Sequence, residues 1–142
     1  MNELILLHGV NLNLLGERPL AHYGTITLTQ LEEAVTAKVA EYDWNCLCFQ
    51  TNYEGKFVEY LHEFRDADAI IINPGAWTHY SYALRDALEI VRAPVAEVHI
   101  SDINSREDWR KHSVVSEVVS FTISGKGLEG YLEAVERLIL KQ

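Results

Sequence analysis

The stretch Glu3-Leu4-Ile5-Leu6-Leu7-His8, at residues 3–8, decides the class of fold. Its apolar residues run almost without interruption, which is typical of a strand covered on both faces of a parallel sheet. The stretch Ala69-Ile70-Ile71-Ile72-Asn73 has the same pattern and is cut off by Pro74-Gly75. Both stretches therefore predict buried, parallel strands.

Further strands and helices alternate outward from these two stretches. Apolar runs predict strands at residues 45–50, 95–100 and 118–124. Helical spacing predicts helices from Thr27, at 57–64, at about 81–91 and from Leu128 onward, whereas residues 102–117 read as a polar loop with one helical turn at 107–111. Thr27 and Gln30 have the spacing of a capping box. Five strands alternating with helices predict an α/β fold with helices on both sides of a parallel sheet, and we expect residues 1–142 to form a single catalytic domain.

The composition argues against several classes of protein. The 142 residues are 48% hydrophobic and 23% charged, which is not the composition of a disordered chain. No apolar run approaches the ~18 residues that span a bilayer, and the first residues lack the basic segment of a signal peptide, so we expect a cytoplasmic protein with no membrane partner. The 12 Lys+Arg and 21 Asp+Glu give a net charge of −9, which argues against nucleic acid but not against a small anionic ligand.

We expect neither a metal nor a nucleotide. Cys46 and Cys48 would share one face of a strand, where we interpret them as small apolar residues. His79, His99 and His112 lack the spacing of zinc ligands. The G-x-G-x-x-G pattern at residues 125–130 lacks the following strand and acidic residue of a dinucleotide fingerprint, and its glycines suit a tight turn.

Candidate site residues come from the loops, because ligands of such sheets bind beyond the carboxyl ends of the strands. Arg18 lies five residues before Tyr23, and a guanidinium favours the ionised form of a neighbouring phenol, which can then act as a base. Glu97 and His99 share one face of a strand, and a carboxylate beside an imidazole suits a general acid. Further polar candidates follow the third and fourth strands: Asn73, Thr78, His79, Asp86, Ser101, Arg110 and His112.

Two alternatives from other functional classes share this architecture. One is a binding module for a flavin, a nucleotide or a small acid, and the other is a scaffold that acts through oligomer contacts alone. The loop at residues 9–16 lacks the Ser and Thr residues of a flavin-phosphate loop. A phosphoacceptor regulator would end its third strand in Asp, where this chain has Asn73. Both kinds of binding module therefore lack residues that they need.

A series of short motifs runs in order along essentially the whole chain. It comprises Asn11-Leu12-Asn13-Leu14-Leu15-Gly16, Arg18 with Tyr23-Gly24, Asn52 with Glu54-Gly55, Asn73-Pro74-Gly75-Ala76, Thr78-His79, Ala83-Leu84-Arg85-Asp86-Ala87, Glu97-Val98-His99-Ile100-Ser101, Arg106-Glu107, Arg110 with His112-Ser113, and Gly127 with Gly130-Tyr131. Taken together, the series resembles the type II 3-dehydroquinate dehydratase family.

The resemblance implies a flavodoxin-like three-layer sandwich and a hydro-lyase that needs no cofactor. The reaction would be the reversible anti elimination of water from 3-dehydroquinate, giving 3-dehydroshikimate, in the shikimate pathway or in quinate breakdown. Tyr23 would remove a proton to form an enolate, with Arg18 stabilising charge and Asn11 holding the enolate through a water. His99, supported by Glu97, would protonate the departing hydroxyl.

The same resemblance implies the substrate contacts and the assembly. Asn73, His79 and Arg110 would bind substrate hydroxyls. Ile100 and Ser101 would hold the substrate carboxylate. Asp86 would reach the site of a neighbouring subunit in a homododecamer built as a tetramer of trimers.

Four positions depart from the usual pattern of the family. Val10 stands in place of Pro, Pro19 directly follows Arg18 where a Glu-Pro pair is usual, Tyr53 replaces His, and Asp102 replaces Asn. None of these changes removes a proposed catalytic group. We expect them to affect the loop between Gly16 and Gly24, which could close over substrate, rather than the type of reaction.

Overall fold

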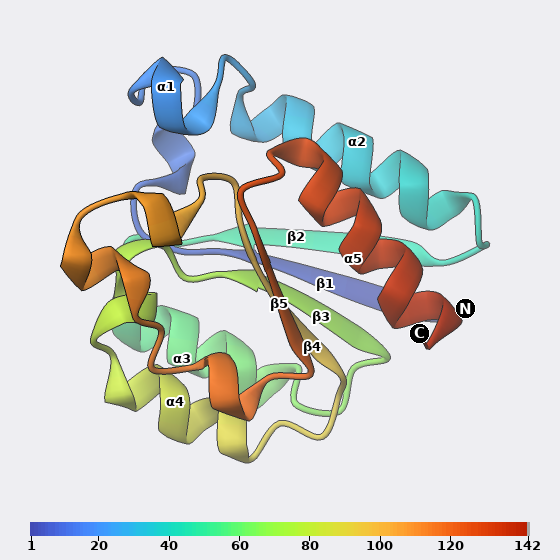
Figure 1. Ribbon diagram of the computed structural model, residues 1–142. Helices are drawn as coiled ribbons and strands as arrows, with labels where there is room; N and C mark the ends of the chain where they lie inside the picture. The colour runs from blue at the N-terminus through green and yellow to red at the C-terminus, as the bar shows by residue number, and fades with distance from the viewer. Residues whose placement is uncertain (142) are drawn as a thin grey trace.

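A five-stranded sheet between two layers of helices forms the computed structural model, which describes residues 1–141 (Figure 1). The strands are β1 (Glu3–His8), β2 (Asn45–Gln50), β3 (Ala69–Asn73), β4 (Val95–His99) and β5 (Phe121–Ser124). All neighbouring strands are parallel, in the order β2-β1-β3-β4-β5. This confirms the predicted parallel sheet, and the order is that of flavodoxin-like folds.

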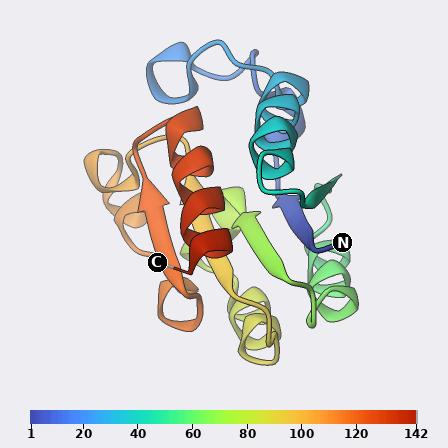
Figure 2. The same cartoon turned by 90° about the vertical axis from the view of Figure 1, so that its right-hand side faces the viewer.

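Two long helices cover each face of the sheet. Helices α2 (Leu28–Ala40) and α5 (Leu128–Leu140) contact each other over one face, and α3 (Glu54–Glu63) and α4 (Tyr82–Glu89) contact each other over the opposite face (Figures 1 and 2). Within residues 1–141, none of the helices combines the length and apolar character needed to cross a membrane. The shorter helices are α1 (Leu20–Tyr23), η1 (Leu12–Leu14), η2 (Gly75–His79), η3 (Ile103–Ser105), η4 (Asp108–Lys111) and η5 (Ser116–Val118).

The continuous apolar run of β1 is explained by two separate cores. Leu4 and Leu6 point into the core beneath α2 and α5, whereas Ile5 and Leu7 point into the core beneath α3 and α4. Successive side chains of a strand face opposite sides, so a strand covered on both faces needs apolar residues at every position. The central strands are therefore fixed in place, and their ends can carry a site.

The predicted capping box at the start of α2 is confirmed. The Thr27 hydroxyl accepts from the Gln30 amide N–H at 3.2 Å, and the Gln30 side-chain oxygen accepts from the Thr27 N–H at 3.0 Å. Both bonds satisfy N–H groups that the first turn of a helix leaves without a partner. They also fix the point at which the long loop after β1 rejoins the layer of helices.

The expected strand at residues 118–124 is wrong in its first half. The Val118 N–H donates to the Val115 carbonyl at 3.0 Å and closes the turn of η5, so β5 begins only at Phe121. Val118 and Val119 nevertheless pack against the core beneath α3 and α4. Their apolar character therefore reflects burial in a turn, which an apolar run alone does not distinguish from a strand.

The carboxyl ends of β1, β3 and β4 meet at one edge of the sheet, on the left of Figure 1. Segments η1 and α1 follow β1, η2 follows β3, and η3 and η4 follow β4. The chain reverses its direction of progress across the sheet between β1 and β3, which is where open α/β sheets bind their ligands.

Candidate active site

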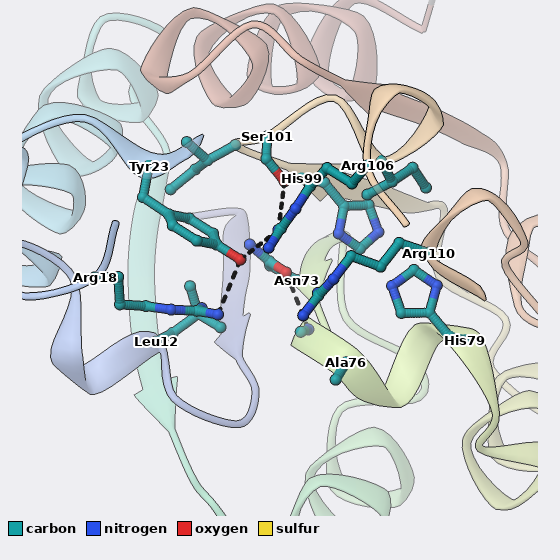
Figure 3. Close-up of a pocket in the computed structure, with 13 residues that line it drawn as sticks. Leu12, Arg18, Tyr23, Asn73, Ala76, His79, His99, Ser101, Arg106 and Arg110 are labelled. Atoms are coloured by element: carbon teal, nitrogen blue, oxygen red, sulfur yellow. Dashed lines mark hydrogen bonds between the residues drawn. The ribbon is translucent and has the colours of Figure 1, made fainter. Parts of the chain in front are cut away.

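A pocket lies at this edge of the sheet, between the loops that follow β1, β3 and β4 (Figure 3). Eight of the ten predicted site residues line it, namely Arg18, Tyr23, Asn73, His79, His99, Ile100, Ser101 and Arg110. Its other lining residues are Leu12, Gly75, Ala76, Ile103 and Arg106. The loops enclose a cavity of about 30 Å³.

The phenol of Tyr23 is held by two arginines. Tyr23 ends α1 and is buried, and its Oη accepts from Arg18 Nη2 at 2.8 Å and from Arg106 Nη1 at 2.7 Å (Figure 3). The Arg18 guanidinium also lies 3.9 Å from the centre of the phenol ring. Two charged donors that bind one oxygen can stabilise negative charge that develops on it. The arrangement therefore suits a phenolate that accepts a proton.

Arg106 is the site residue that the sequence did not assign. It lies in the irregular segment after β4, next to Glu107, and only its place in the family-like motifs indicated it. Its Nη1 also lies 3.3 Å from the Ser101 hydroxyl, and its Nε is buried without a hydrogen-bond partner among residues 1–141. Burial lowers the pKa of Arg18, and Arg106 and Arg110 lower it further against the opposing effect of Tyr23. A cluster of three arginines suits an anionic ligand.

Glu97 and His99 form a buried ion pair opposite the phenol. Both lie on one face of β4, as predicted, and the imidazole Nε2 lies 2.6 Å from Oε2 of the fully buried carboxylate. Burial alone would raise the pKa of Glu97, but hydrogen bonds from His99, Thr78 and Ser113 outweigh it and hold that pKa below its usual range. An ionised carboxylate only accepts, so His99 Nε2 carries a proton and Nδ1 is the ring nitrogen left for a ligand.

Asn73 presents its amide from the end of β3 in a fixed orientation. Its Oδ1 accepts from the Gly75 N–H at 3.0 Å, and its Nδ2 donates to the Tyr131 hydroxyl at 2.9 Å. Tyr131 is fully buried on α5. An amide nitrogen carries two hydrogens. Asn73 therefore has one N–H left, which it can donate to a ligand in the pocket.

His79 and Arg110 form the wall of the pocket nearest η2 and η4. The carbonyl of His112 accepts from His79 Nδ1 at 2.7 Å, which leaves His79 Nε2 as an acceptor. Burial lowers the pKa of His79, so its imidazole is neutral near pH 7. Arg110 Nε donates to the Glu107 carboxylate at 2.6 Å, while its guanidinium lies 4.1 Å from the ring of Trp109. Its terminal N–H groups can still bind a ligand oxygen.

The segment Ile100-Ser101 is tied to the glycine-rich turn before α5. The Gly127 N–H donates to the Ile100 carbonyl at 3.2 Å, and the Gly125 N–H donates to the Ser101 carbonyl at 3.1 Å. Gly125 has φ +80°, and a Cβ there would lie 3.0 Å from Asp102. The G-x-G-x-x-G pattern is therefore a tight turn that supports the pocket, as the sequence predicted.

Asn11 and Asp86 do not line the pocket of the single chain. Asn11 adopts a left-handed backbone conformation with φ 68°, its side chain is exposed, and its N–H donates to the Asn52 side-chain oxygen at 2.9 Å. It directly precedes Leu12, which does line the pocket. Asp86 lies on α4, outside the pocket. Its expected role concerns a neighbouring subunit and stays a prediction.

Metal ligands do not gather in the part of the chain that the structure describes. Across residues 1–141, no three His, Cys, Asp or Glu side chains are placed to hold one ion. Cys46 and Cys48 are free, their sulfur atoms lie 3.8 Å apart, and both pack against the core beneath α2. This packing confirms their interpretation as small apolar residues of the strand.

Comparison with known proteins identifies close relatives of the whole chain. The family described as Dehydroquinase class II matches residues 2–139. A relative named 3-dehydroquinate dehydratase, from Pelobacter propionicus, is 49% identical over 133 residues, which cover 92% of this chain and 89% of the relative. Another of the same name, from Dictyoglomus turgidum, is 48% identical over 141 residues, covering 99% and 97%. The crystal structure of type II dehydroquinase from Propionibacterium acnes superposes with a TM-score of 0.95 at 39% identity, covering 99% of this chain and 97% of that one.

Proposed function

The chain belongs to the class II dehydroquinase family, and from this premise we propose that Tyr23 and His99 dehydrate 3-dehydroquinate to 3-dehydroshikimate as base and acid. The relatives make the protein a hydro-lyase with a small-molecule substrate in the shikimate pathway; the same step would also serve quinate breakdown. One observation carries the assignment of roles: a phenol held by two arginines and an imidazole held by a buried carboxylate line the same small pocket.

Tyr23 begins the reaction by removing a proton. Its phenolate oxygen takes the proton from C2, next to the ketone, and the electron pair of that C–H bond forms an enolate. Arg18 and Arg106 both donate to the phenolic oxygen, which supports its ionised form before the proton moves. Asn11 would hold the enolate through a water, after a small change in the loop that carries it.

His99 completes the elimination by donating a proton. Its Nδ1–H transfers the proton to the C1 hydroxyl, which leaves as water while the enolate collapses to the conjugated ketone. The ionised Glu97 stabilises the imidazolium before this transfer and keeps Nε2 protonated after it. Solvent then carries the proton from Tyr23 back to His99, so that no cofactor is consumed.

The remaining pocket residues suit an anion rich in hydroxyl groups. Asn73 offers one N–H, His79 offers Nε2, and Arg110 offers its terminal N–H groups to substrate hydroxyls. Ile100 and Ser101 would hold the substrate carboxylate, and the positive charge of Arg106 lies 3.3 Å from the Ser101 hydroxyl. Charged donors in a buried site favour a carboxylate ligand.

Entry of the substrate requires a loop to move. The cavity of about 30 Å³ holds about two water molecules, which is too little for a cyclic acid. Arg18 and Tyr23 lie on the segment between Gly16 and Gly24, whose φ angles are 97° and 67°. Glycines in such conformations can absorb a change of backbone direction. We propose that this segment opens to admit substrate and closes over it.

The proposed assembly is a homododecamer in the cytoplasm, built as a tetramer of trimers. Asp86 supports it in part, because it lies on α4 near the exposed aromatic side chain of Tyr82. Large exposed apolar groups beside a charged residue are typical of contacts between subunits. Sedimentation velocity measures this directly, and a monomeric protein that is fully active would contradict the assembly.

The reaction is tested by mixing the protein with 3-dehydroquinate and following the ultraviolet absorbance of the conjugated product. We expect absorbance to rise with the wild-type protein. Tyr23→Phe should fold normally and lose nearly all turnover, because the phenyl ring keeps the packing but cannot accept the proton. Folded wild-type protein without any rise would overturn the reaction. Substantial turnover by Tyr23→Phe would place the base elsewhere, and a yellow protein stabilised by flavin would favour the binding module.

A further inference from the structure

The carboxylate of Glu97 accepts more hydrogen bonds than its pairing with His99 requires. Its Oε2 accepts from His99 Nε2 at 2.6 Å and from the Thr78 hydroxyl at 2.5 Å. Its Oε1 accepts from the Thr122 hydroxyl at 3.1 Å. The Ser113 hydroxyl lies 3.2 Å from Oε1 and 3.1 Å from Oε2. The donors therefore come from η2, β4, β5 and the segment before η5.

Among residues 1–141, Thr122 is the donor that serves Oε1 alone. Ser113 has a single hydroxyl hydrogen to share between the two carboxylate oxygens. Its oxygen is itself engaged as the acceptor of the Val115 and Ser116 N–H groups, at 3.2 and 3.1 Å. Thr78 and His99 both donate to Oε2. Without the Thr122 hydroxyl, Oε1 would therefore keep the Ser113 hydroxyl as its partner, and Ser113 shares its one hydrogen between Oε1 and Oε2.

Thr122 reaches this buried carboxylate from an exposed position. It lies on β5, at the edge of the sheet, and pairs directly with Glu97 in the parallel register. Thr122 is exposed to solvent, whereas Glu97 is fully buried. An exposed site on an edge strand tolerates substitution, and β-branched residues are favoured there. The position is therefore open to a mutational test that leaves the fold intact.

We propose that Thr122 is a positioning residue of the reaction, which fixes the rotation of the Glu97 carboxylate and so aims His99 Nδ1 into the pocket. The last torsion of a glutamate side chain is broad, so the carboxylate plane needs partners on both oxygens to be fixed. The two bonds to Oε2 locate one oxygen, and the bond from Thr122 sets the direction of the other. This inference rests on the proposed role of His99 as the acid.

The hydroxyl donors also preserve the negative charge that His99 needs. A neutral hydroxyl stabilises the ionised carboxylate without cancelling its charge, which a lysine or arginine in the same place would do. The other titratable or charged groups near this cluster are His79 on η2 and Arg110 on η4. Burial lowers the pKa of His79, and the positive charge of Arg110 lowers it further, whereas Glu97 opposes this. On the other side of β4, the register partner of Glu97 is Ile72 of β3, which is apolar and carries no titratable group.

The test compares Thr122→Val with Thr122→Ser. Valine keeps the shape of the side chain and removes the hydroxyl, so we expect kcat to fall about tenfold with the KM for 3-dehydroquinate unchanged. We also expect the fall of kcat on the acid side of the pH profile to begin at a higher pH, because loss of a donor raises the pKa of Glu97. Serine restores the hydroxyl and should restore both kcat and the pH profile.

The outcomes separate this inference from the proposed function. A Thr122→Val enzyme with wild-type kcat and pH profile would overturn the positioning role, and so would a Thr122→Ser enzyme as slow as Thr122→Val, which would assign the effect to packing. Thermal unfolding should show both variants cooperatively folded, with Thr122→Ser close to the wild type and Thr122→Val melting a few degrees lower, because a buried carboxylate loses one donor. If His99→Asn abolishes turnover while Thr122→Val changes nothing, only the role of Thr122 fails. A fully active His99→Asn would overturn both proposals.

Discussion

Two guanidinium groups from opposite sides of the pocket donate hydrogen bonds to the phenolic oxygen of Tyr23. Arg18 comes from the loop after β1, and Arg106 comes from the loop after β4. Within residues 1–141, neither guanidinium forms an ion pair with a carboxylate, and both line the pocket and donate to the phenolic oxygen. Charged donors in a partly buried pocket of this kind contribute more to the stabilisation of a developing charge than they would in water.

We predict that Arg106→Gln lowers kcat about 10- to 100-fold, because a charged hydrogen bond to the phenolate is worth about 1.5–3 kcal/mol. Steady-state kinetics at saturating 3-dehydroquinate measure the change in kcat. Arg65→Gln is the matched control, because Arg65 is exposed and is not one of the residues that line the pocket. A wild-type kcat in Arg106→Gln would contradict the role of its charge.

Tyr131 acts on the pocket through Asn73, and we predict that Tyr131→Phe raises KM several-fold with a smaller effect on kcat. The phenyl ring keeps the packing of α5, but the Asn73 amide loses the acceptor that fixes its orientation. The buried N–H left without a partner should also lower the free energy of unfolding by about 1 kcal/mol. Urea unfolding and kinetics measure the two effects. Tyr42→Phe, which packs against the same core, is the control; an equal rise of KM there would refute the link through Asn73.

At the scale of the elements, the sequence predicts best where packing is regular. The apolar runs of β1 and β3 and the capping box of α2 appear in the structure as expected, because burial on two faces and helix capping leave a direct mark on the sequence. The start of β5 was misjudged, because Val118 and Val119 are buried in a turn. The spacing of apolar residues predicts the bounds of a strand or helix only where the same periodicity continues to its end, and at the start of β5 it does not.

The candidate site follows the same division. Tyr23 with Arg18, and His99 with Glu97, are each close in sequence, so their contacts could be predicted from spacing. Arg106 contacts Tyr23 across 83 residues, and it lies between two short 3-10 turns that have no apolar period. Contacts of this kind depend on how separate loops meet at one edge of the sheet. Only the three-dimensional structure brings them together.

The start of α2 is the element whose stability is simplest to test. We predict that Thr27→Ala lowers the free energy of unfolding by about 1 kcal/mol, because the hydroxyl that accepts from the Gln30 N–H at the N-cap is lost, while the backbone N–H of residue 27 can still donate to the Gln30 side chain. Chemical denaturation measures the change. Thr29→Ala, at an exposed position inside the same helix, should leave stability unchanged or slightly raised, since alanine favours helices. Equal losses in the two variants would show that the cap is not the cause.

At the scale of the whole molecule, the net charge of −9 contrasts with the positive charge of the pocket. Arg18, Arg106 and Arg110 all line a cavity of about 30 Å³. A cleft lined by one sign of charge focuses the electric field, so a protein that repels polyanions can still attract a small organic acid. The arginines lie on the loops that follow β1 and β4. The same part of the fold therefore supplies the positive charge and the loop whose movement would admit the substrate.

The proposed trimer makes a prediction about how subunits share their sites. If Asp86 serves the site of a neighbour, assemblies of Tyr23→Phe subunits alone should be inactive, and assemblies of Asp86→Ala subunits alone should bind substrate weakly. Subunits of the two kinds, unfolded together and refolded as mixed trimers, should regain activity. In such a trimer, an Asp86→Ala subunit supplies Tyr23 to its own site, and a neighbouring Tyr23→Phe subunit supplies Asp86 to that same site.

At equal mixing, half of the sites have an intact Tyr23, and about half of these have a neighbour with an intact Asp86. About a quarter of the sites are therefore complete, so turnover at low substrate should rise to about a quarter of the wild-type value. Turnover of the refolded mixture at limiting 3-dehydroquinate measures this, and the control is the same two proteins mixed without unfolding, whose subunits stay separate. If Asp86 serves only its own chain, the refolded mixture should give the mean of its two parents. The position of Asp86 on α4, outside the pocket of its own chain, is the structural reason for expecting the first result.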